Sequence, residues 1–166
     1  MIRPSLTAAE HAQFDRYDEQ FRLTDDRGAA VLAGAYLDQL MKQLLEASVA
    51  SGSAPEGGAH VPFSRRVRDA RRNGLLDATT LADLEFLGRV RNHFAHVFEG
   101  ATFAHPDVQA LCAQLSTAGW TAEFEPAIRA DASRTARMRF VLAVQFAMFA
   151  INRAKPEHVR WAAMPG

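Results

Sequence analysis

The sequence predicts an all-α fold, a single-domain helical bundle. Alanine, the residue with the highest helix propensity, is the commonest residue, with 31 copies among 166 residues. Apolar residues recur at steps of three and four along several segments. No long alternating run of Val, Ile, Thr and Tyr indicates a strand. A chain of this length with 48% hydrophobic residues suits one domain, 1–166, with its own core.

Two helices are expected in the first 50 residues. Thr7-Ala8-Ala9-Glu10 is typical of a capping box and predicts a helix to about Leu23. Thr24 or Asp25 can cap a second helix, which runs to about Ala50. Its apolar residues share one face: Ala30, Ala33, Leu37, Leu40, Met41 and Leu44. Residues 51–59 are rich in Gly, Ser and Pro and predict a loop.

Two further helices are expected before residue 100. Residues 62–72 are typical of a short helix that Asn73-Gly74 ends in a left-handed conformation. Asp77 or Thr79 then opens a long helix to about Phe98, and Gly100 ends it. We expect this helix to lie antiparallel to the one over residues 25–50, because apolar faces must pack together.

The last third is expected to hold two helices and an irregular segment. Pro106-Asp107 begins a helix to about Thr117, and residues 119–129 look irregular or briefly extended. The final helix runs from about Ala132 to Ala154 and is apolar on more than one face, which predicts a central helix or a subunit interface. On this ground we expect a homodimer. Pro156 ends the helix, and the tail, 156–166, is expected to be mobile.

Charge and composition exclude several classes of protein. The net charge is zero, so no overall field draws the chain to DNA or membrane. The single cysteine, Cys112, excludes an internal disulfide and a cysteine-rich zinc site. No apolar run reaches the length of a transmembrane helix, and the N-terminus lacks the apolar centre of a signal peptide. We expect a cytoplasmic protein with no membrane partner, no metal and no cofactor.

The segment Arg89-Val90-Arg91-Asn92-His93-Phe94-Ala95-His96 carries the most promising chemistry. On a helix, Asn92 and His96 share a face, and Arg91 leaves the edge of the apolar side. The three could line one polar cleft. A guanidinium binds phosphate bidentately, an imidazole can move a proton near neutral pH, and an amide can orient either. Alternatively, Arg91 pairs with a carboxylate and His96 only helps to end the helix.

The short helix over residues 62–72 is the best electrostatic candidate for nucleic-acid binding. Arg65, Arg68 and Arg72 would form one exposed row that could follow phosphates. The alternative is a solvated face that Asp69 and other acidic neighbours neutralise. This helix and the next imitate a helix-turn-helix, but the connector over residues 73–78 is too long and the second helix looks buried. A regulator of this kind could therefore act through DNA, RNA or a protein partner.

One structural ion pair is also expected. Arg27 opens an alanine-rich helix with little space on its inner side, so its guanidinium needs a carboxylate partner. We expect Glu85 to be that partner, with Asp38 as the next choice. A metal site built from His93, His96 and Glu99 is a weak alternative, because zinc sites usually recruit a more distant ligand.

Two resemblances bear on function. Arg91, its polar neighbour Asn92 and His96 match the motif of HEPN domains, which implies a helical bundle that dimerises and a metal-independent endoribonuclease with these residues as its catalytic set.

A longer stretch resembles the mannitol operon repressor family, from about residue 24 to about 106. The matching segments are 26–38, Phe63-Ser64, Gly74-Leu75-Leu76-Asp77 and 83–96. This implies a non-catalytic transcriptional repressor of sugar-alcohol uptake. We take the regulator as the first interpretation, and a HEPN-type endoribonuclease or RNA-binding protein as the alternative.

Overall fold

The computed structural model describes residues 8–50, 61–97 and 100–155, and this part of the chain is helical with no strand. The all-α prediction is therefore confirmed. In chain order the elements are α1 (Ala8–Leu23), α2 (Asp26–Ala50), α3 (Phe63–Arg72), α4 (Ala78–His96), α5 (Pro106–Cys112), the 3₁₀ helix η1 (Ser116–Glu123), α6 (Pro126–Arg129) and α7 (Ala132–Ala154). The predicted loop over residues 51–59, Glu99 and the tail, 156–166, lie outside the described residues.

Local signals set most helix ends. The Asp77 carboxylate caps α4 by accepting from the Thr80 backbone N–H at 2.9 Å and from its hydroxyl at 2.6 Å. Partial burial alone would raise the pKa of Asp77, but these hydrogen bonds hold it below its ordinary value. Asp131 caps α7 by accepting from the backbone N–H groups of Ser133 and Arg134, at 2.9 and 3.1 Å. Gly74, at φ 62°, ends α3 in the left-handed region that favours glycine.

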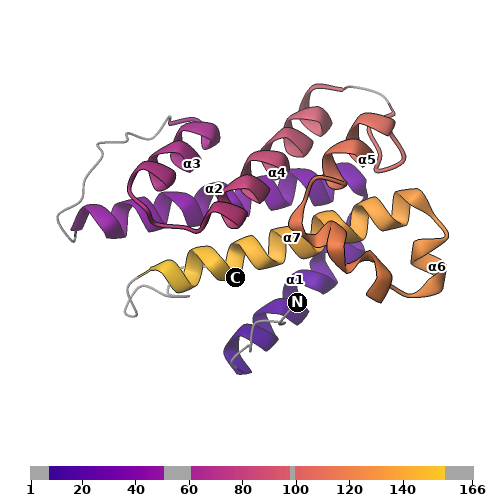
Figure 1. Ribbon diagram of the computed structural model, residues 1–166, viewed down its shortest axis with the longest axis horizontal. Coiled ribbons are helices and arrows are strands. Elements are labelled where there is room, and N and C mark those ends of the chain that lie inside the picture. Colours follow the sequence, from indigo (N-terminus) through magenta and orange to yellow (C-terminus); the bar gives the residue numbers. More distant parts are fainter. Residues whose placement is uncertain (1–7, 51–60, 98–99, 156–166) are drawn as a thin grey trace.

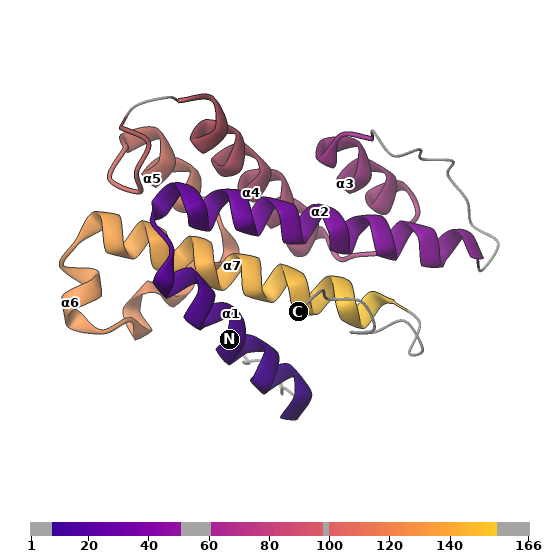
Figure 2. The same cartoon turned by 180° about the vertical axis from the view of Figure 1, so that it is seen from behind.

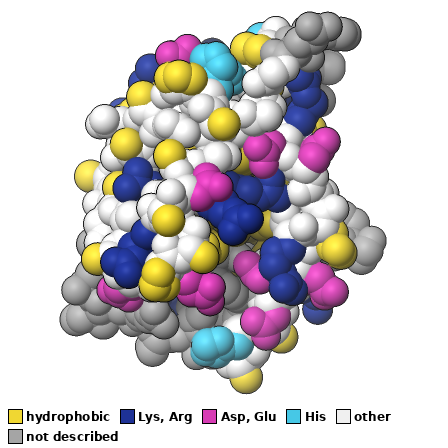
Figure 3. All heavy atoms as spheres, turned by 90° about the vertical axis from the view of Figure 1, so that its right-hand side faces the viewer, with side chains coloured by type: hydrophobic (Ala, Val, Ile, Leu, Met, Phe, Trp, Pro, Cys, Tyr) yellow, Lys and Arg dark blue, Asp and Glu magenta, His cyan; other side chains and the backbone are white. Residues whose placement is uncertain are grey.

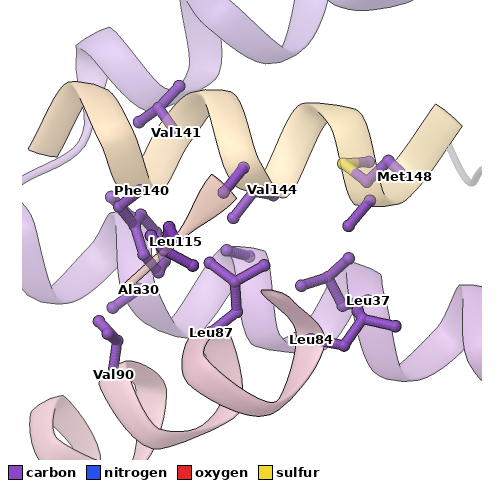
Figure 4. Close-up of a cluster of buried hydrophobic side chains, with 14 of the residues drawn as sticks. Ala30, Leu37, Leu84, Leu87, Val90, Leu115, Phe140, Val141, Val144 and Met148 are labelled. Atoms are coloured by element: carbon purple, nitrogen blue, oxygen red, sulfur yellow. The ribbon is translucent and has the colours of Figure 1, made fainter. Parts of the chain in front are cut away.

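The helix α7 lies at the centre of the bundle (Figures 1 and 2). The helices α2 and α7 run in the same direction, and α4 runs back against α2, as predicted for the two long helices. Figure 4 shows apolar side chains from α2, α4 and α7 converging in the core, among them Leu37, Leu87 and Val144. Their burial is the main favourable contribution to folding.

The structure corrects the prediction for residues 106–129. The helix that was expected to reach Thr117 ends at Cys112, and the segment expected to be irregular forms η1 and the one-turn helix α6. Tertiary contacts account for this difference. Trp120 in η1 packs on Phe146 of α7 with ring centroids 5.3 Å apart, and Thr117 donates a hydrogen bond to the Arg139 carbonyl at 2.8 Å.

The apolar faces of α7 are covered within one chain. The helix packs against α1, α2, α4, α5, α6 and η1, and its buried residues include Val141 and Phe149, which lie away from its main apolar face. The pattern that motivated the homodimer is thus explained by a central helix. The homodimer stays a prediction, but the apolar faces of α7 no longer support it.

A polar junction joins the turn between α1 and α2 to the first half of α7. The Arg137 guanidinium pairs with Asp26 and also donates to the carbonyls of Phe21 and Thr24, at 2.5 and 2.7 Å. The second Asp26 oxygen accepts from the Phe103 backbone N–H at 2.9 Å. Figure 3 faces the side of the bundle where α5, α6 and the start of α7 lie, and basic and acidic side chains adjoin there. No helix in the described ranges has the length and apolar character needed to cross a bilayer.

The buried Lys155 predicts an unusual dependence of stability on pH. Its amine donates to Gln43 at 2.6 Å, and burial lowers its pKa from 10.5 to about 8. Between pH 8 and 10.5 the unfolded chain therefore binds more protons than the folded chain, so stability from this group rises with pH across that window. Against a Lys155→Met variant, the wild type should gain about 2 kcal/mol between pH 7.5 and 10 in urea unfolding. Parallel pH profiles for the two proteins would contradict this.

Candidate functional site

A groove of about 760 Å³ lies between α2, α3 and α4. Its apolar residues come from all three helices and from α7. Val31 and Phe63 are at least partly exposed, whereas the others are buried beneath the floor of the groove: Leu37, Val67, Leu84, Leu87 and Phe140. Its charged surface comes mainly from α3 and α4, with Arg68 and Arg71 on one side and Arg89 and Arg91 on the other. A concave surface of this size with a few convergent polar groups is typical of a binding site.

The groove is positively charged although the chain as a whole is neutral. The two carboxylates that line it, Asp38 and Glu85, are already used by arginines. Asp38 accepts from Arg66 at 3.0 Å, and Glu85 pairs with Arg71 at 2.9 Å. Among the described residues, Arg68, Arg89 and Arg91 form no ion pair, although Arg89 lies over the Phe86 ring. Three guanidinium groups are therefore available to an anionic ligand.

Arg91 is held in place by a close approach between α4 and α2. Its aliphatic stem crosses Gly34, where an added Cβ would lie only 2.7 Å from Arg91 Cγ. Its Nη1 donates to Asn92 Oδ1 at 3.1 Å. Both side chains are exposed and line the groove. Arg91 forms no ion pair with Glu85 or Asp38, which pair with Arg71 and Arg66. The alternative in which Arg91 pairs with a carboxylate is wrong.

His96 lies one helical turn beyond Asn92 on the same face of α4 and is exposed. It does not belong to the residues that line the groove. The structure thus places Arg91 and Asn92 in the predicted cleft and His96 outside it, at the end of the helix. This end is the C-terminus of α4.

The helix α3 is fixed against α2 by a half-buried ion pair, in which the arginine is buried and the Asp38 side chain is 43% exposed. Arg66 is 5% exposed and reaches Asp38 through its Nε. The Phe63 ring packs so tightly on α4 that a Cβ at Gly88 would lie 3.2 Å from it. These two contacts set the distance between the walls of the groove.

The predicted row of Arg65, Arg68 and Arg72 divides in the structure. Arg65 and Arg72 flank Asp69, each 3.7 Å from one of its oxygens, whereas Arg68 lines the groove. Two members of the row thus share one carboxylate, and only the third faces the groove; nucleic-acid binding by the row as a whole stays a prediction.

The groove also contains Arg71 and Arg89, which lie outside the predicted row on the short helix and outside the predicted set of Arg91, Asn92 and His96. Their positions follow from how closely the three helices pack, which helical spacing alone does not reveal. The small residues Gly34 and Gly88 were the available signal, since close helix packing requires them.

The predicted ion pair between Arg27 and Glu85 is not formed. Arg27 donates to the Val97 carbonyl at the end of α4, at 2.6 Å, and Glu85 faces Arg71. The second choice, Asp38, is held by Arg66. The reason is the position of α3, which brings its arginines closer to both carboxylates than Arg27 can come.

Neither histidine nor cysteine is found among the described residues that line the groove, so the site offers guanidinium, amide and carboxylate groups only. Cys112 is buried in the core, and burial raises the pKa of its thiol to about 12. Comparisons of the chain with family models, curated proteins and solved structures find no match. The function is therefore inferred from the groove and from the sequence pattern.

The contact between Gly34 and Arg91 predicts a coupled pair of substitutions. Gly34→Ala alone should leave the free energy of unfolding unchanged or lower it, because the new methyl group overlaps the Arg91 stem. In an Arg91→Ala background the overlap is gone, and Gly34→Ala should stabilise by about 0.5 to 1 kcal/mol, the usual benefit of alanine within a helix. Urea unfolding of the four proteins measures the coupling. Equal effects of Gly34→Ala in both backgrounds would contradict the close approach.

Proposed function

We propose that this protein is a cytoplasmic regulatory protein that binds nucleic acid through the groove between α2, α3 and α4. The observation that carries the proposal is the convergence of Arg68, Arg89 and Arg91, none of them in an ion pair among the described residues, on one concave surface. Guanidinium groups bind phosphate oxygens through paired N–H donors. Asn92 adds an amide beside them, at hydrogen-bond distance from Arg91.

The geometry favours contact with the phosphates of a single strand or a loop. In a helix-turn-helix, the second helix must enter the major groove of duplex DNA. Here α4 would be that helix, but it is packed in the core through Leu84, Leu87 and Val90, among others. A strand laid along the groove would instead meet arginines from both walls, with the partly exposed Phe63 ring available to a base.

The resemblance to the mannitol operon repressor family supports a regulatory role. The matching segments include the part of α2 that carries Gly34 and Asp38 and the part of α4 that carries Arg91. In this proposal, control of expression follows from binding of the transcript or of opened DNA, alone or with a protein partner. A homodimer would present two such grooves.

Substitutions in the groove should weaken nucleic-acid binding. Arg68→Gln and Arg91→Gln should each reduce affinity for a fluorescent single-stranded RNA by about tenfold, because each removes hydrogen bonds to charged phosphate. The slope of log affinity against log salt should become shallower by about 0.7 for each phosphate that is no longer neutralised. Fluorescence anisotropy at several salt concentrations measures both quantities, with single-stranded and duplex DNA of the same sequence as further ligands.

The matched controls are exposed arginines outside the groove. Arg134 lies at the start of α7 and pairs with Asp131, and Arg65 pairs with Asp69. Arg134→Gln and Arg65→Gln should leave affinity and salt slope unchanged. If all four variants bind alike, or if the wild type binds none of these ligands, the groove is not a nucleic-acid site.

A metal-independent endoribonuclease is a second candidate, because Arg91 and Asn92 face the groove and His96 is accessible one turn away. In this mechanism the substrate 2′-hydroxyl attacks the adjacent phosphorus, and the 5′-oxygen leaves. His96 would exchange protons with one of these oxygens, and Arg91 would stabilise the charge on the phosphoryl oxygens. Because two proton transfers occur, this candidate also requires a dimer that brings two copies of His96 together.

An RNA cleavage assay in excess chelator tests this second candidate. His96→Ala should lower the cleavage rate by about 100-fold or more, and Arg91→Ala should also lower it. DNA of the same sequence should stay intact, because it lacks the 2′-hydroxyl. Cleavage at the same rate by the wild type and both variants would point to a contaminating nuclease. If the wild type cleaves no RNA, the endoribonuclease is excluded and binding is the function that remains.

A further inference from the structure

A second group of chemically capable side chains lies outside the groove, where α4 ends and α5 begins. His93 belongs to the last turn of α4, His105 caps α5, and Asp107 lies in its first turn. One candidate ligand atom from each residue lies within 4.8 Å of the other two. This juxtaposition depends on the fold, since His93 lies in α4 and His105 caps α5.

The His93 side chain gives an independent reason to look for a ligand here. Its Nε2 is buried, and in the described part of the chain it finds no hydrogen-bond partner. Buried polar atoms are nearly always satisfied, by protein, water or an ion. The His93 and His105 rings face each other with centroids 4.6 Å apart and a 55° tilt. Two imidazole rings at this distance can direct nitrogen atoms at one point.

The third side chain supplies the negative charge. Asp107 Oδ2 lies 3.8 Å from His105 Nδ1, and that nitrogen also accepts from the Asp107 backbone N–H at 3.2 Å. Tetrahedral zinc holds its ligands about 2.0 to 2.1 Å away, which puts the ligand atoms about 3.4 Å from one another. The cluster therefore has to contract slightly. The Asp107 side chain is 78% exposed and the His105 side chain, at the N-cap of α5, is 36% exposed, so both have space to move by that amount.

We propose that His93, His105 and Asp107 form a binding site for Zn²⁺. Two imidazoles and one carboxylate suit zinc, whereas Mg²⁺ and Ca²⁺ prefer oxygen ligands. Three protein ligands leave a fourth position for water or for a ligand. The bound ion would tie the end of α4 to the start of α5, next to the turn that carries Asn92. The site is independent of the groove and of the proposed function.

Zinc binding by the full-length chain tests this proposal. Isothermal titration with ZnCl₂ should show one site, and saturating zinc should raise the melting temperature by about 5 to 10 °C when its concentration is about 100 times the dissociation constant. MgCl₂ should do neither. His105→Asn keeps a good helix cap but removes the imidazole, and Asp107→Asn keeps the size of the side chain.

Both variants should bind zinc at least tenfold more weakly than the wild type, with unchanged helix content by circular dichroism in the absence of metal. His11→Asn, which removes an exposed histidine of α1, is the matched control and should bind as the wild type does. The proposal is overturned if the wild type binds no zinc, if either His105→Asn or Asp107→Asn keeps wild-type affinity, or if His11→Asn loses it.

Discussion

The half-buried ion pair between Arg66 and Asp38 is the contact on which the groove depends. It joins α3 to α2 at a point where the arginine is almost fully buried, so removing either partner would leave a buried charge or an empty space. The helix α3 is only ten residues long, too short to be stable alone, and it needs this tertiary contact. Once α3 is fixed, Arg68 and Arg71 face α4 across the groove.

Glycines then decide how the arginines of α4 are presented. At Gly34 the α2 backbone leaves space for the Arg91 stem, and at Gly88 the α4 backbone leaves space for Phe63. Both glycines contact the carbon atoms of a side chain. The contact at Gly34 fixes the stem that carries the Arg91 guanidinium, and the contact at Gly88 fixes α3 against α4. A side chain that is held along its length loses less entropy on binding than a free one, so the contact at Gly34 organises the Arg91 stem in advance of any binding.

The helices could be predicted from sequence because their signals are local. Asp77 and Asp131 cap their helices, and the spacing of apolar residues sets the faces of α2, α4 and α7. The exposure of Arg91 also followed from its place at the edge of an apolar face. Partner choice did not follow, because it depends on where α3 lies. From the sequence we expected Glu85 to pair with Arg27, but in the structure Glu85 pairs with Arg71. Likewise, the apolar faces of α7 are compatible with either a central helix or a subunit interface. The sequence pattern does not show that α1 and η1 pack on these faces.

The central claim is that the groove arginines, and not the other arginines, contact the nucleic acid. The most direct test is NMR of the arginine Nε–Hε resonances, assigned by substitution, while a single-stranded RNA is added to the full chain. The account predicts that the resonances of Arg68, Arg89 and Arg91 shift with a common affinity, and that those of Arg65 and Arg134 stay in place. Shifts confined to Arg65, Arg72 or Arg134 would contradict it.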